Sequence, residues 1–131
     1  MIVVLDCNIW VSLAINSQIE FIANLFDDGV VIATCTNLRN EITDVLHRPK
    51  LSKFISNPDI EKVVELHDLI TISYKLSKIP DIVADPKDNY LFALALKAKA
   101  DFLITGDKLL LKAIEYKKTK VITLPNFKKI I

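Results

Sequence analysis

Four acidic residues occupy positions from which a folded chain could bring them together. Asp6 ends the apolar run in "VVLDCNIW", and Asp107 follows the apolar run in "FLITGDK". Asp88 lies in "VADPKDN", before an alanine- and leucine-rich stretch, and Glu41 interrupts the apolar side of a helical pattern. Converging carboxylates repel one another unless a divalent cation binds between them. Because these ligands are all oxygens, the pattern favours a hard ion, Mg²⁺ or Mn²⁺.

An ion held in this way supports the hydrolysis of phosphate esters. It makes a bound water a usable nucleophile near neutral pH and neutralises the charge that develops on phosphate oxygens. Asn8 and Thr105 lie beside the first and last acids, where they could orient a carboxylate or the attacking water. Asp85, three residues before Asp88, is a further candidate ligand in the same segment.

Each acid also has a simpler explanation when it is taken alone. Asp6, Asp88 and Asp107 all precede helical patterns, and an aspartate in that position accepts hydrogen bonds from the first backbone N–H groups of the helix. Glu41 alone could be a solvated acid on a helix surface. The metal-site hypothesis therefore depends on all four acids meeting at one place.

The elements that position these acids alternate along the chain. Buried strands are predicted over residues 1–5, 30–33, 69–74, 102–105 and 121–123. Helices are predicted from a capping box at residues 17–20 to Gly29, over residues 37–47, from residue 57 towards 69, over 89–99 and over 109–116, with a terminal turn at 127–131. Such alternation is typical of parallel βαβ units. In an open parallel sheet, ligands bind beyond the carboxyl ends of the strands, where Asp6 and Asp107 would both lie.

Composition predicts one globular domain over residues 1–131. The chain is 51% hydrophobic and 25% charged, with two glycines and no low-complexity segment. The first residues lack the pattern of a signal peptide, and no uncharged run is long enough for a membrane span, so we expect a cytoplasmic protein. Cys7 and Cys35 are expected to be reduced core residues. Residues 1–38 carry a net charge of −4, and the remaining residues carry +5. This division would suit a basic rim around an acidic centre, which could bind a polyanionic substrate.

Longer segments carry a resemblance to a known family. The stretches "VVLDCNIW", "NEITDVL", "DPKDNYLFALALKAKADFLITGDKLLL" and "ITLPNF" together resemble a PIN-domain nuclease, of the branch assigned as toxin components of toxin–antitoxin systems. The similarity spans essentially the whole chain. It implies a three-layer αβα fold with a central parallel five-stranded sheet and metal-dependent cleavage of RNA. It also implies a small antitoxin protein as partner and a homodimer.

The resemblance also assigns roles to individual residues. Asp6, Glu41, Asp88 and Asp107 match the acidic quartet that holds one or two Mg²⁺ or Mn²⁺ ions, and Asn8 and Thr105 match supporting positions. Two positions depart from the family pattern. Cys7 stands where many relatives have Thr or Ser, and Asn89 stands where some have a further Asp, which leaves the choice among Asp85, Asp88 and Asn89 open.

Basic and aromatic residues near the acids supply candidates for binding the substrate. The candidate bases are Arg39, His47, Arg48, Lys50, Lys87, Lys108 and Lys112. They could hold phosphates on either side of the cleaved bond, although solvated surface lysines are the commoner interpretation. Trp10 and Tyr90 could stack on unpaired bases, but each lies in an apolar run typical of the core.

Two other function classes begin from the same residues. Aspartyl-phosphate phosphatases also start with a strand that ends in Asp, but they typically need a second Asp two residues later, where this chain has Asn8. A catalytically weak PIN-like module that binds RNA or protein is the non-enzymatic alternative. The presence of all four acids argues against it.

Overall fold

The computed structural model describes residues 1–77, 79 and 88–131. The strands are β1 (Ile2–Leu5), β2 (Val31–Thr34), β3 (Thr71–Ser73), β4 (Phe102–Ile104), β5 (Glu115–Tyr116) and β6 (Thr119–Ile122). The helices are α1 (Cys7–Ile15), α2 (Glu20–Asp27), α3 (Thr36–Leu46), α4 (Asn57–Ile70), α5 (Asn89–Ala98), α6 (Lys108–Leu111) and α7 (Leu124–Ile130), with a 3₁₀ turn, η1 (Pro49–Leu51).

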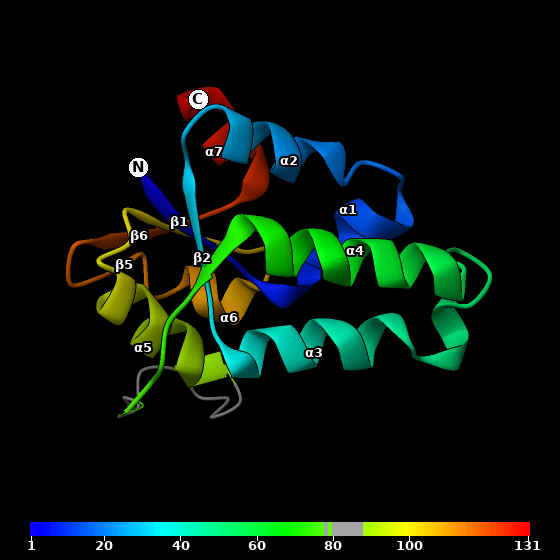
Figure 1. Ribbon diagram of the computed structural model, residues 1–131. Coiled ribbons are helices and arrows are strands. Elements are labelled where there is room, and N and C mark those ends of the chain that lie inside the picture. Colours follow the sequence, from blue (N-terminus) through cyan, green and yellow to red (C-terminus); the bar gives the residue numbers. More distant parts are fainter. Residues whose placement is uncertain (78, 80–87) are drawn as a thin grey trace.

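The strands form a mostly parallel sheet in the order β3-β2-β1-β4-β6-β5. Strands β3, β2, β1, β4 and β6 run parallel to one another, and β5 pairs antiparallel with β6. The predicted three-layer α/β fold is therefore confirmed. Figure 1 shows α5 on one side of the sheet, where it contacts β1, β2 and β4, and α2 and α7 on the other side.

The predicted count of five strands is wrong by one, because the end of the helix predicted over residues 109–116 is a strand. Helix α6 ends at Leu111, and Ile114 and Lys117 have φ of 59° and 56°. These left-handed residues turn the chain out of the helix and into a hairpin that pairs Glu115 with Lys120. No glycine marks the turn, so the sequence pattern gave no signal of it.

The predicted capping box at residues 17–20 is also wrong. Ser17 has φ of 56°, and the Gln18 N–H donates to the Leu13 carbonyl, 2.8 Å away. This is the Schellman pattern that ends a helix, so Ser17 terminates α1 instead of starting α2. The N-cap residue of α2 is Ile19, whose side chain makes no capping bond.

Helix α5 is buried nearly all round, as its composition predicts. Its buried residues are Asn89, Tyr90, Leu91, Phe92, Ala93, Leu94, Ala95 and Ala98. Trp10 is also buried, with 1% of its surface exposed, so the expectation that Trp10 and Tyr90 belong to the core is confirmed. The free thiols of Cys7 and Cys35 are buried as well.

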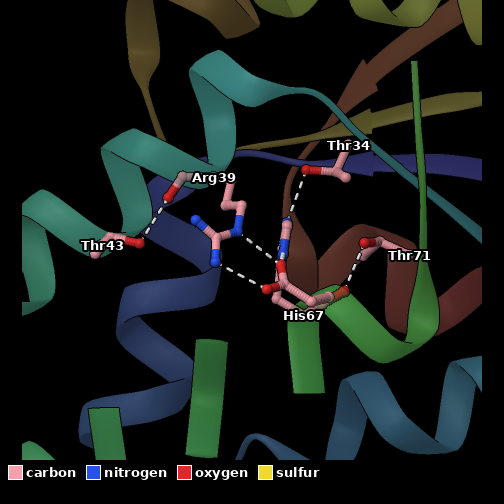
Figure 2. A network of polar contacts seen from close by, with 6 residues as sticks. Thr34, Arg39, Thr43, His67 and Thr71 are labelled. Atoms are coloured by element: carbon pink, nitrogen blue, oxygen red, sulfur yellow. Dashed lines mark hydrogen bonds and ion pairs between the residues drawn. The ribbon is translucent and has the colours of Figure 1, made fainter. Parts of the chain in front are cut away.

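A polar network joins α3 and α4 to the end of β2 (Figure 2). The Arg39 guanidinium donates two hydrogen bonds of 2.8 Å to the Asp68 carboxylate, which also lies 2.9 Å from His67 Nδ1. His67 Nε2 lies 2.7 Å from Thr34 Oγ1. Burial lowers the pKa of His67, whose ring also packs edge-on against Trp10. The network therefore fixes how α3 leaves the sheet.

Within the described residues, no single helix is long and apolar enough to cross a membrane. Helices α1 and α2 meet the criteria of length and composition only as a pair bent by 117°.

Two phenylalanines test how far core packing determines stability. Phe127 is fully buried and meets Phe102 edge-on at 5.9 Å, whereas 47% of Phe26 is exposed. We expect Phe127→Ala to lower the free energy of unfolding by about 3–5 kcal/mol. Phe26→Ala should lower it by about 1 kcal/mol or less, because less buried surface is lost. Urea unfolding followed by circular dichroism measures both, and equal losses would contradict the packing described here.

Candidate active site

The structure brings the four predicted acids around one cavity of about 500 Å³. Asp6, Glu41, Asp88 and Asp107 all line this cavity, together with Asn8. Asp6 follows β1 and Asp107 follows β4, and these two strands are adjacent and parallel. Glu41 comes from α3, and Asp88 is the N-cap residue of α5. Asp85 and Lys87, the remaining predicted residues of that segment, lie outside the described residues.

Asp6 is a buried carboxylate held on both of its oxygens. Its Oδ1 accepts a hydrogen bond from the Cys7 N–H at 2.6 Å, and its Oδ2 accepts one from Thr105 Oγ1 at 2.7 Å. The Thr105 contact follows from register, because Leu5 pairs with Ile104 and the next residues meet at the strand ends. Burial raises the pKa of Asp6 to about 6, with a smaller contribution from the charges of Glu41 and Asp107.

Thr105 also connects the first acid to the fourth. Its Oγ1 accepts a hydrogen bond from the Asp107 N–H at 3.0 Å while its hydroxyl donates to Asp6. Asp107 Oδ1 in turn accepts from the Leu109 N–H at 2.8 Å. The capping explanation therefore holds for one oxygen of Asp6 and one oxygen of Asp107. Both residues cap a helix and line the cavity, so the capping role does not exclude a role in the cavity.

Glu41 is held by a side chain from another helix. Tyr90 Oη donates a hydrogen bond of 3.1 Å to Glu41 Oε2. Burial and the neighbouring acids raise the pKa of Tyr90 and of Cys7, so the Tyr90 hydroxyl remains a protonated donor and Cys7 remains a thiol. The sequence gave no sign of this role, because Tyr90 lies in an apolar run that predicts a core residue.

The donor set fits a hydrated hard cation better than an ion enclosed by protein. Among the described residues, no three His, Cys, Asp or Glu side chains are arranged to hold one metal ion. Mg²⁺ usually keeps several waters and binds protein through one or two carboxylates, so it does not require such a group. Carboxylates around a cavity wide enough for waters are consistent with that mode of binding. Asp6, Glu41, Asp88 and Asp107 are the residues that could hold it.

Only one of the candidate bases within the described residues lines the cavity. This base is Arg48, from the turn after α3. Arg39 pairs with Asp68 beside another, smaller cavity. His47 is the C-cap residue of α3, and its Nδ1 lies 2.8 Å from the Thr43 carbonyl, as a helix-end residue would.

The fold and the site together define an α/β protein with acidic residues at the carboxyl edge of its sheet. The family model of the PIN domain matches residues 2–109. The chain therefore belongs to the PIN-domain family. PIN domains are generally nucleases, which supports nuclease activity at the level of the family.

Two crystal structures have similar folds. PAE2754 from Pyrobaculum aerophilum is 13% identical, with a TM-score of 0.67 over 95% of this chain and 85% of that one. VapBC2 from Rickettsia felis, bound to a DNA fragment from its promoter, is 15% identical, with a TM-score of 0.58 over 94% of this chain and 98% of that one. No curated protein matches the sequence. At these identities the likeness establishes the fold.

The raised pKa of Asp6 predicts that this residue costs stability in the metal-free protein. Its pKa rises from 3.8 to about 6 on folding, so the cost develops as the pH rises through this interval and is complete above it. The shift corresponds to about 3 kcal/mol. We expect metal-free Asp6→Asn to be more stable than wild type at pH 7.5 and to lose this advantage near pH 4. Urea unfolding in EDTA at the two pH values measures the difference; a constant difference would contradict the assignment.

The hydrogen bond from the Tyr90 hydroxyl to Glu41 predicts an effect on metal binding that can be separated from the packing of the Tyr90 ring. Tyr90→Phe removes one donor to Glu41 and keeps the packing of the ring. We expect Mn²⁺ affinity, measured by calorimetry, to fall by about 10-fold or more, as for other residues that support metal ligands. Tyr74→Phe is the matched control, because Tyr74 does not line the cavity. Equal affinities for the two variants would show that the hydrogen bond to Glu41 does not support the ion.

Proposed function

We propose that the protein is a Mg²⁺- or Mn²⁺-dependent endoribonuclease that hydrolyses phosphodiester bonds in RNA. The observation that carries the proposal is the shared cavity of Asp6, Glu41, Asp88 and Asp107 in a PIN domain. A bound divalent ion would supply an activated water and neutralise charge on the phosphate. Four acids from four separate elements are unlike an ordinary set of helix caps, since each would repel the others without a cation.

The chain's own residues prepare this site. Thr105 and the Cys7 N–H hold the Asp6 carboxylate in one orientation, and Tyr90 does the same for Glu41. Burial of Asp6 and Thr105 keeps bulk water from these contacts, which strengthens them. Asn8, on the cavity wall, would orient the attacking water through its side-chain amide.

We further propose that the nuclease is the toxin of a toxin–antitoxin pair, with a small antitoxin protein as partner and a homodimer as the active form. The sequence resemblance supports this role, and the fold likeness to VapBC2 agrees with it. Exposed apolar side chains offer surface for such contacts; the most exposed include Leu69, Ile114 and Phe54.

A PIN-like module that binds RNA or protein without cleaving is the alternative. The observation that favours it is the lack, among the described residues, of three candidate ligands arranged around one ion. Direct binding of the metal separates the two functions. Calorimetry with Mn²⁺ should show binding that Asp107→Asn weakens if the site is catalytic, and no binding if the protein is only a module.

Cleavage of a mixed pool of single-stranded RNA tests the nuclease. We expect cutting that requires Mn²⁺ or Mg²⁺, stops in EDTA and falls by about 100-fold or more in Asp107→Asn, because a metal ligand is lost. Asp59→Asn is the matched control, since Asp59 is an exposed acid on α4 outside the cavity. Cutting that persists equally in both variants would come from a contaminating nuclease. Mapping the cut ends would define the sequence preference.

A further inference from the structure

The cavity extends well beyond the four acids, along a trough between α1 and α3. Cys7, Val11 and Ile15 line it from α1, four residues apart, so they share one face of that helix. Glu41 and Val45 line it from α3, and Arg48 lines it just past the end of the same helix. The two helices pack against each other. At 1.5 Å per residue, Arg48 lies about 10 Å farther along than Glu41.

The walls of the trough change character along this length. The end near the sheet carries the acids, whereas Val11, Ile15 and Val45 form apolar walls farther out, with the Ser12 hydroxyl beside them. The whole cavity, at about 500 Å³, is far larger than one hydrated ion needs. It lies within the range of about 300–1,000 Å³ typical of sites for small organic ligands.

Arg48 gives the trough a cation at its outer end. Its side chain lines the same cavity as the four acids. The ion pairs formed among the described residues use other cations, those of Arg39, Lys62 and Lys118. The fork of an arginine side chain matches the oxygens of a phosphate in a way that a lysine does not.

We propose that this trough binds one unpaired nucleotide of the RNA next to the cleaved bond. The base would lie against Val11, Ile15 and Val45, and the phosphate of that nucleotide would bind Arg48. The inference rests on the proposed nuclease function and specifies its substrate. A base that enters the trough cannot remain stacked and paired, so the RNA must be single-stranded at this position.

Steady-state kinetics on an eight-nucleotide single-stranded RNA with Mn²⁺ test the subsite. We expect Arg48→Gln to raise KM about tenfold and to leave kcat within about twofold, because a charged contact to bound substrate is lost. Lys50→Gln is the control, since Lys50 lies two residues away and outside the cavity. It should change KM by less than about twofold. Val45→Trp, which fills the trough, should raise KM at least as much as Arg48→Gln.

A second substrate separates the subsite from the metal centre. Methyl p-nitrophenyl phosphate is a diester without a nucleotide, so its hydrolysis should be the same in wild type, Arg48→Gln and Lys50→Gln. If wild type cleaves RNA and Arg48→Gln behaves like Lys50→Gln, the subsite is refuted and the nuclease stands.

A binding measurement covers the case in which wild type cleaves neither substrate and the nuclease proposal fails. Fluorescence anisotropy with labelled RNA, in the presence of Ca²⁺, should show that Arg48→Gln binds the RNA about tenfold more weakly than wild type does. Equal binding by Arg48→Gln and the control Lys50→Gln refutes the subsite. The absence of RNA binding by wild type refutes it as well. Either result would leave the trough to another ligand, such as a segment of a partner protein.

Discussion

The structure depends on a carboxylate that is buried at the end of a central strand. Asp6 is 4% exposed, and burial makes its charged form unfavourable in the metal-free protein. Two donors compensate in part: the N–H of Cys7, the next residue along the chain, and the Thr105 hydroxyl, whose position follows from the pairing of β1 with β4. The parallel register therefore fixes the orientation of the carboxylate, and a cation in the cavity would remove the remaining cost.

The second constraint is the direction in which α3 leaves the sheet. Glu41 and Arg48 belong to one helix and its final turn, so a single movement of α3 would shift the acid and the base of the cavity together. The contacts of His67 with Thr34 and Asp68, and of Asp68 with Arg39, tie α3 to α4 and to β2. The exposed Arg39–Asp68 pair adds little stability by itself. The role of this pair is to hold α3 in position against α4, and the buried His67 ring supports that position.

Much of the fold could be predicted because strong local patterns agree with the tertiary structure. The apolar runs that became β1, β2 and β4 are short and end at polar residues, and α5 is apolar and buried on most of its sides, with Leu96 and Lys97 exposed. Errors arose where the backbone adopts conformations that side-chain type does not encode. Ser17, Ile114 and Lys117 have positive φ without being glycines, so a helix end and a hairpin were missed.

The sequence by itself determined the alternation of strands and helices, and with it the edge of the sheet at which Asp6 and Asp107 lie. Periodicity within α3 also placed Glu41 on the inner side of its helix. The sequence also indicated Thr105 as a support for a carboxylate. Only the tertiary structure decided that Tyr90 holds Glu41, because this contact joins two helices that are far apart in the sequence. It also decided that Arg48 shares their cavity, since the packing of α1 against α3 is set by long-range contacts that a linear pattern does not contain.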